Sequence, residues 1–152
     1  MFETEIQARV RDVNAGGHVD SVEAIRILDE ARLLFLRAGD AAAGTPGVMA
    51  SAPTGVSELV ASHRIDYRSE MRFVAFQPFL VSIWVAHVGR TSFTLDYELR
   101  IAGGHDPAIV GETTCVCFDG PAERAWPLSD AVRARLESHR RAPLALRERP
   151  AG

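Results

Sequence analysis

Cysteine is scarce in this sequence, which has only Cys115 and Cys117 among 152 residues. In a strand, residues i and i+2 point to the same face, and this placement suits a disulfide poorly. We therefore expect two reduced residues buried in the core. The five histidines are scattered, with no pair at metal-ligand spacing and no cluster of cysteines or carboxylates beside them. The sequence predicts no metal site.

Long apolar runs and an excess of positive charge are also missing. No run approaches the length of a membrane span, and the acidic start at residues 1–5 is unlike a signal peptide. Lys and Arg number 17 against 20 for Asp and Glu, and the net charge of −3 argues against nucleic-acid binding. We expect a cytoplasmic protein that neither inserts into a membrane nor binds nucleic acid.

Apolar residues make up 47% of the chain, enough for the core of one domain. Their spacing predicts one strand, a long helix, four more strands and a short helix. We expect strands at 2–11, 56–68, 79–88, 92–101 and 108–118, and helices at 21–38 and 129–139. Residues 1–140 then form a single domain, and residues 141–152 form a frayed C-terminal tail.

Two of the predicted strands carry more specific expectations. Strand 79–88 is apolar on both faces, as in a central strand or one covered by a partner subunit. In strand 56–68, strict alternation places five residues on one face: Leu59, Ala61, His63, Ile65 and Tyr67.

The loop at residues 12–20 leads directly into the long helix. It contains Gly16 and Gly17, which permit backbone conformations closed to other residues and let a ligand approach the main chain. Asp20 or Ser21 can cap the helix, whose first N–H groups then point toward the loop. A polar loop at a helix N-terminus is a plausible place for chemistry on a polarised carbonyl.

Three stretches together resemble the hotdog-fold acyl-CoA thioesterases of the 4-hydroxybenzoyl-CoA thioesterase type. Residues 12–21 (DVNAGGHVDS) resemble the family's D-x-D-x-x-G-H-V-N-N, and residues 29–36 (DEARLLFL) resemble its E-E-A-R-x-x-F-L. Residues 65–67 (IDY) and 89–98 (GRTSFTLDYE) resemble its I-D-Y and G-R-S-S-F-x-x-x-Y-E.

The resemblance implies an α+β hotdog fold: a long central helix wrapped by a curved five-stranded antiparallel sheet, with a short C-terminal helix. It implies homodimers, or homotetramers, with active sites at the subunit interface and the acyl group in a tunnel beside the helix. The substrate is then an acyl-CoA or an acyl-carrier-protein thioester. Coenzyme A enters only as part of that substrate, so no separate cofactor is expected.

The resemblance also assigns candidate catalytic residues. The N–H that polarises the thioester carbonyl falls near Ser21, with Gly17 beside it. The family's usual acid falls on Asn14, and an amide cannot take a proton from water at neutral pH, although it can orient water. A base then has to come from elsewhere, and the nearby candidates are Asp12, His18, Asp20 and Glu30.

Each candidate has a structural interpretation beside the catalytic one. Asp12 and Asn14 can hold the turn through loop amides, and His18 can donate to a backbone carbonyl. Glu30 can pair with Arg26, four residues earlier in the helix, and Asp20 can be a simple cap.

Substrate binding requires cations for the coenzyme phosphates and an apolar lining for the acyl group. We expect Arg90, in the turn that resembles G-R-S-S, to be the main cation, with three alternatives: Arg64, Arg68 and Arg72. Five residues can line the acyl tunnel and are equally explicable as core: Ile25, Leu28, Tyr67, Phe73 and Phe76.

We therefore expect a hydrolase that cleaves a thioester whose carbonyl is polarised by helix N-terminal N–H groups. One alternative is a hotdog enoyl-CoA hydratase, because Asp12, Asn14 and His18 resemble that group's D-x-N-P-x-H, without the proline and with the histidine one residue later. A second alternative is a non-catalytic acyl-CoA-binding protein, since Asn14 replaces the usual acid.

Overall fold

The computed structural model describes residues 1–40 and 43–148. It contains the strands β1 (Phe2–Ile6), β2 (Val56–Tyr67), β3 (Phe79–Val88), β4 (Ser92–Arg100), β5 (Ile109–Asp119) and β6 (Arg124–Ala125). Its helices are α1 (Ser21–Leu33), which continues as the π-helical segment η2 (Leu34–Ala38), α2 (Asp130–Ser138) and the short 3-10 helix η1 (Val10–Asp12).

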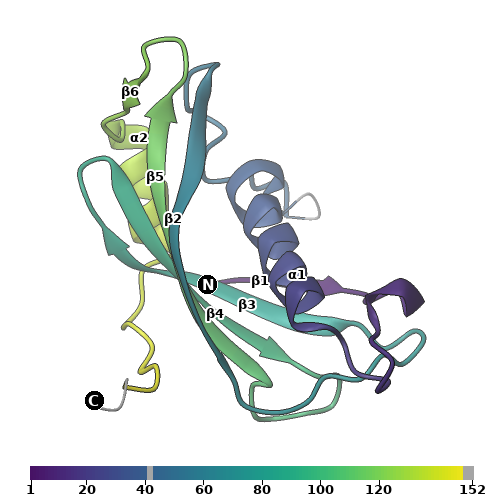
Figure 1. Cartoon of the computed structure of the whole chain (residues 1–152). Helices are drawn as coiled ribbons and strands as arrows, with labels where there is room; N and C mark the ends of the chain where they lie inside the picture. Colours follow the sequence, from purple (N-terminus) through teal and green to yellow (C-terminus); the bar gives the residue numbers. More distant parts are fainter. Residues whose placement is uncertain (41–42, 149–152) are drawn as a thin grey trace.

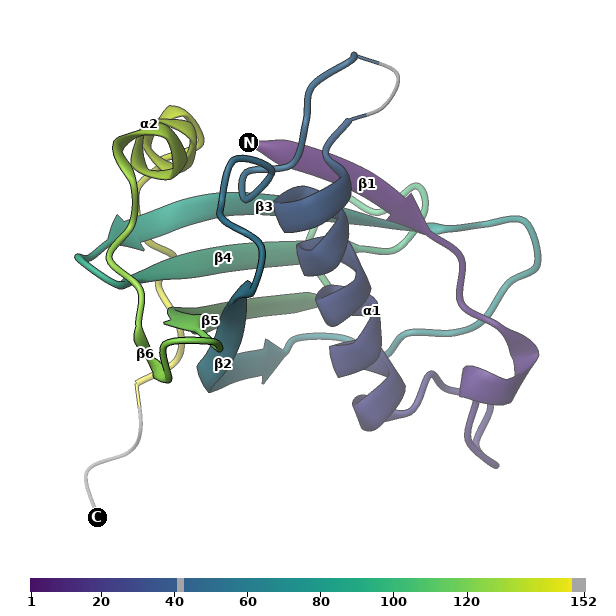
Figure 2. The same cartoon turned by 90° about the horizontal axis from the view of Figure 1, so that it is seen from above.

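The strands form one antiparallel sheet in the order β1-β3-β4-β5-β2, with β6 paired to β5. The sheet is curved, and α1 lies across its concave face (Figures 1 and 2). Inward-facing residues of β3, β4 and β5 pack with α1 into the core. This confirms the predicted α+β hotdog architecture. The structure has six strands rather than the predicted five. The additional strand, β6, has only two residues, which is too few to give a periodic pattern in the sequence.

The first strand ends at Ile6, so the prediction of a strand to residue 11 was wrong. Ile6 pairs with Phe79, the first residue of β3, so residues after Ile6 have no partner strand to pair with. The chain then turns into η1, where the N–H of Asp12 donates to the Arg9 carbonyl at 2.9 Å. Alternation in the sequence continues past the last paired residue because Ala8 is still buried.

The long helix extends to residue 38 as predicted, but its last turn is π-helical. The wider turn leaves the carbonyls of Phe35 and Leu36 to accept from the N–H groups of Val48 and Met49. Gly39 ends the helix at φ 72°, and a Cβ there would lie 2.1 Å from the Thr45 carbonyl oxygen. Only glycine fits that position.

The β2 register corrects one predicted face. A bulge between Val60 and Ser62 puts Leu59 opposite Val116 and His63 opposite Thr113. Val116 and Thr113 lie on opposite faces of β5, so Leu59 and His63 do not share a face, and the strict alternation was wrong. β2 is also an edge strand, and Leu59 is 49% exposed.

The helix near the C-terminus forms as predicted. The Ser129 hydroxyl accepts a hydrogen bond from the Val132 N–H at 3.3 Å, and Val132 and Leu136 are fully buried. This cap and these two apolar residues fix α2 beside the sheet.

The chain after α2 crosses the sheet on the face opposite α1 (Figure 1). Trp84 Nε1 donates to the Ala142 carbonyl at 3.1 Å, and the Leu144 N–H donates to Asp96 Oδ2 at 2.7 Å. The Arg147 N–H donates to Asp66 on β2 at 2.7 Å. Part of the segment predicted to be frayed is thus hydrogen-bonded to the sheet, and residues 149–152 lie outside the described residues.

Both cysteines are reduced and buried, as predicted. Burial raises the pKa of Cys115 to about 11 and that of Cys117 to about 12, so neither thiol ionises readily. Within residues 1–40 and 43–148, no helix combines the length and apolar character needed to cross a membrane.

Candidate functional site

A hollow of about 360 Å³ opens at the N-terminal end of α1. Two segments that are far apart in the sequence meet there: the loop at 12–20 and the chain that follows β2. The Val19 N–H donates to the Met71 carbonyl at 2.8 Å, and His18 forms an antiparallel bridge with Arg72. The hollow is lined by His18, Val19, Ser21, Ala24, Tyr67, Arg68, Ser69, Glu70 and Met71.

The start of α1 is fixed by Asp20, whose Oδ1 accepts from the Val22 N–H at 2.9 Å. This settles the cap between Asp20 and Ser21 in favour of Asp20. Tyr67 donates its hydroxyl hydrogen to the Ser21 carbonyl at 3.2 Å. Burial, helped by the charge of Asp20, raises the pKa of Tyr67, so the phenol stays a neutral donor. Ser21 therefore stands at the hollow with the first turn of the helix behind it.

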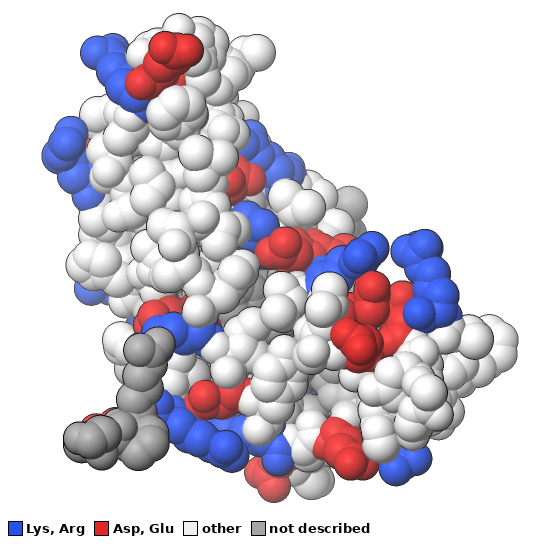
Figure 3. All heavy atoms as spheres, viewed as in Figure 1, with Lys and Arg blue, Asp and Glu red and all other residues white. Residues whose placement is uncertain are grey.

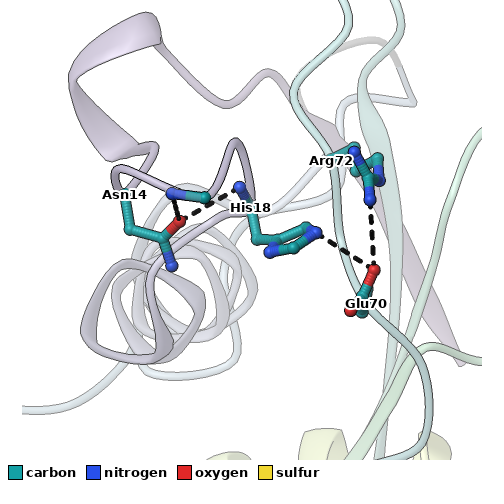
Figure 4. A network of polar contacts seen from close by, with 5 residues as sticks. Asn14, His18, Glu70 and Arg72 are labelled. Carbon is teal, nitrogen blue, oxygen red and sulfur yellow. Dashed lines mark hydrogen bonds and ion pairs between the residues drawn. The ribbon is translucent and has the colours of Figure 1, made fainter.

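Asn14 organises the loop rather than the hollow. Its Oδ1 accepts from the N–H groups of Gly16 at 2.9 Å and His18 at 3.2 Å (Figure 4). Its carbonyl accepts from Gly17, which has φ 79°. The Gly17 N–H is thus used inside the turn, and Gly17 is not among the residues that line the hollow. These contacts fit the interpretation in which Asn14 holds the turn.

His18 reaches out of the loop toward a carboxylate. Its Nε2 lies 3.0 Å from Glu70 Oε2, at ion-pair distance but without the alignment of a hydrogen bond. Arg72 Nη2 lies 3.4 Å from the same oxygen (Figure 4). The His18 side chain is 28% exposed and that of Glu70 is 67% exposed. Sequence reasoning missed Glu70, because no local pattern marks a residue that only loop pairing brings to His18.

Asp12 and Glu30 line a different hollow, also about 360 Å³, on another face of α1. Asp12 is only 8% exposed, and its Oδ2 accepts from the Arg9 N–H at 2.8 Å. The predicted pair between Arg26 and Glu30 was wrong: Arg26 Nε lies 3.0 Å from Glu23, three residues earlier. The structure therefore brings His18 and Ser21 together, and it places Asp12 and Glu30 elsewhere.

The predicted arginines divide in the same way. Arg68 lines the hollow at α1, and Arg72 stands beside it through Glu70. Arg64 projects from the outer face of β2 and lies 3.9 Å from Glu112. Arg90, the preferred cation, sits in the β3–β4 turn at the other end of the sheet, where its carbonyl accepts from Leu128. Within one chain, Arg64 and Arg90 do not reach the hollow.

The predicted acyl-tunnel residues are also dispersed. Tyr67 lines the hollow, Leu28 is buried in the core, and Ile25 is half-buried on α1. Phe73 and Phe76 line a separate groove beside Val10, and Phe76 is 96% exposed with φ 62°. The apolar lining of the hollow comes instead from Val19, Ala24 and Met71. Within the described residues, no group of three or more His, Cys, Asp or Glu is placed to hold a metal ion.

Comparison with solved structures finds the same fold in proteins of low sequence identity. The PA5185 protein of Pseudomonas aeruginosa is 21% identical, with a TM-score of 0.74 and 92% of each chain covered. A thioesterase of Thermus thermophilus, solved with coenzyme A and zinc, is 20% identical, with a TM-score of 0.70 over 93% of this chain and 96% of that one.

A third similar structure is Slr0204 of Synechocystis, a 1,4-dihydroxy-2-naphthoyl-CoA thioesterase. It is 18% identical, with a TM-score of 0.72 over 89% of this chain and 94% of that one. At these identities the likeness shows the fold alone. None of the curated proteins compared with the chain matches it.

The family model of the thioesterase-like superfamily matches residues 8–136. That range includes the loop at 12–20, all of α1, the strands from β2 to β6 and most of α2. Since the match spans most of the sequence and the fold agrees with it, the chain belongs to the thioesterase-like superfamily.

Proposed function

We propose that this protein is a thioesterase that hydrolyses an acyl-CoA or acyl-carrier-protein thioester in the hollow at the start of α1. Membership of the family supports thioester hydrolysis in general. The observation that carries the finer proposal is the convergence of His18, Ser21 and Tyr67 on one hollow at a helix N-terminus. That convergence brings a proton acceptor and a carbonyl-polarising helix end together, and Tyr67 holds the helix start through its hydrogen bond to the Ser21 carbonyl.

In the proposed reaction, the thioester carbonyl oxygen lies against the N–H groups at the start of α1. The positive end of the helix dipole favours the negative charge that develops on that oxygen. His18 takes a proton from the attacking water, and the departing thiolate recovers it. Among the predicted bases, His18 is favoured over Asp12 and Glu30 because only His18 lines the hollow that contains Ser21.

The cations proposed for the coenzyme phosphates are Arg68 and Arg72, which stand at this hollow. Guanidinium groups bind phosphate oxygens through two parallel N–H donors. Arg64 and Arg90 contribute in this proposal only if a second copy of the chain brings them to the site.

Self-association is part of the proposal. β2 is an edge strand with exposed apolar residues, Leu59 at 49% and Val60 at 38%. The surface over β2, β4 and β5, at the upper left of Figure 3, is mostly uncharged, with charged side chains at its top and left margins. Both features suit an edge that pairs with a second copy. Sedimentation velocity tests this, and Leu59→Arg is expected to shift a dimer or tetramer toward the monomer.

The decisive experiment measures free-thiol release from short, branched, aromatic and long acyl-CoAs, beside the same acyl groups on a carrier protein. His18→Gln and Asp12→Asn are run in parallel. Turnover that collapses in His18→Gln and persists in Asp12→Asn supports His18 as the base, and the reverse result restores Asp12. If no substrate releases thiol, thioester hydrolysis is refuted, and hydration of an enoyl-CoA and ligand binding without turnover are assayed next.

A further inference from the structure

We infer that Glu70 supplies the site with the carboxylate that Asn14 cannot provide, by positioning His18 as the base. This inference rests on the proposed function. The resemblance puts an acid in the loop before the helix, where this chain has an amide. The structure places a carboxylate against the same loop from the segment after β2, and Glu70 lines the hollow that His18 and Ser21 share.

The geometry assigns separate tasks to the two nitrogens of the His18 ring. Nε2 is shielded from solvent and faces Glu70 Oε2 at 3.0 Å. Nδ1 lies on the side of Gly16, where a Cβ built on that glycine would be 3.4 Å from it. A carboxylate beside Nε2 favours the tautomer that carries its hydrogen there. Nδ1 then keeps a lone pair that can accept a proton.

The backbone holds the two residues in register. The Val19 N–H donates to the Met71 carbonyl, and His18 bridges Arg72, so the two segments form a short antiparallel contact directly after Glu70. Arg72 Nη2 is 3.4 Å from Glu70 Oε2 and limits where that carboxylate can turn (Figure 4). Asn14 fixes the His18 backbone from the other side. Glu70 therefore lies between His18 of the loop and Arg72 of its own segment.

Stability does not explain this pair. The Glu70 side chain is 67% exposed, and exposed ion pairs contribute little to folding. A pair that adds little to folding but orients the ring in a candidate site is expected to affect turnover far more than unfolding. This difference separates positioning from a structural role.

The reaction step balances with these groups alone. The water oxygen bonds to the thioester carbonyl carbon as its proton passes to His18 Nδ1, and the hydrogen on Nε2 stays there, facing the negative charge of Glu70. The carbon–sulfur bond then breaks, and the sulfur leaves with the electron pair and takes the proton from Nδ1. The acid product and the free thiol are released, and His18 returns to its starting tautomer.

The test compares Glu70→Gln with Glu70→Asp and with the matched control Glu137→Gln. Glu137 is another exposed carboxylate paired to an arginine, and it lies on α2. On the substrate class found by thiol release, Glu70→Gln is expected to lower kcat by about 10- to 100-fold, with KM within about threefold and the unfolding midpoint unchanged. Glu70→Asp should recover part of kcat, and Glu137→Gln should match the unchanged protein.

Two further readouts keep the inference open to refutation. Nitrogen-15 shifts of the His18 ring should report the hydrogen on Nε2 in the unchanged protein and a mixed tautomer in Glu70→Gln. The double variant with His18→Gln should be no slower than His18→Gln alone, because paired groups are not additive. An unchanged kcat and tautomer in Glu70→Gln overturn the inference, whereas absence of thiol release from the unchanged protein overturns the proposed function instead.

Discussion

Two carboxylates in this molecule sit in opposite surroundings, Glu70 at the open hollow and Asp96 under the C-terminal segment. Glu70 is mostly exposed, and its Oε2 faces the His18 ring and the Arg72 guanidinium. Asp96, on β4, is 0% exposed; its Oδ2 accepts from the Leu144 N–H, and among the described residues its Oδ1 has no partner. The first carboxylate is exposed to solvent, and the second is buried.

The difference separates chemistry from stability. Glu70 is surrounded by solvent, so its ion pairs add little to the stability of the fold. Burial raises the pKa of Asp96 to about 6, the nearby charge of Glu112 adds to this, and the Leu144 hydrogen bond opposes it. The folded state therefore holds the Asp96 proton more tightly than the unfolded chain does. The resulting stability is fully present below the unfolded pKa near 3.8 and is lost as the pH rises through about 6.

The largest expected effect is at the hollow. His18→Gln should lower kcat by about 100-fold or more, because it removes the proposed base, while the free energy of unfolding stays nearly the same. Steady-state thiol release and urea unfolding of the same preparation check this. A parallel loss of activity and stability would mean that His18 belongs to the fold rather than to the chemistry.

The reverse result is expected under the C-terminal segment. Asp96→Asn removes the buried charge but keeps an acceptor for Leu144, so it should stabilise the protein at pH 7 by up to about 2 kcal/mol and much less at pH 4. Activity should not change. Urea unfolding at both pH values gives the difference, and identical pH dependence in both proteins would contradict the raised pKa of Asp96.

A smaller effect is expected from the donor above Asp96. Leu144→Pro removes the N–H that faces the carboxylate, whereas Leu144→Ala keeps it. The proline variant should be about 1 kcal/mol less stable than the alanine variant. In a Trp126→Phe background, the emission of Trp84 reports whether the segment has left the sheet. Equal stability of the two variants would show that this hydrogen bond contributes nothing.

The smallest effect is expected at Asn14. Asn14→Asp restores the family's usual acid but keeps the oxygen that accepts from Gly16 and His18, so kcat should stay within about threefold. A gain of about tenfold or more, measured by thiol release, would show that an acid in the loop is the better base. Glu70 would then no longer be needed as a substitute for the acid that the loop lacks.

Much of the fold could be predicted because its signals are local. Alternation in residues 92–100 and the apolar spacing of α1 are properties of neighbouring residues, and so are the caps at Asp20 and Ser129. The bulge in β2 was not predicted, since its position depends on pairing with β5. The end of β1 was predicted wrongly because it depends on where β3 begins.

The candidate site was predictable only in part. The loop at 12–20 is marked by its own residues, and His18 and Ser21 do face one hollow. Asp12 and Glu30 share that region of the sequence but lie at another hollow, because the 3-10 turn and the helical rotation direct them there. Arg90 resembles a family motif yet stands at the other end of the sheet.

The sequence by itself determined the elements, their order, the loop that leads into α1 and the family to which they belong. These follow from residue spacing and from turn and cap chemistry, which act over a few residues. Only the tertiary structure decided that Glu70 meets His18 and that Asp96 is covered by Leu144. Such contacts join segments far apart in the chain, and their distances are set by strand register and packing, which no local pattern contains.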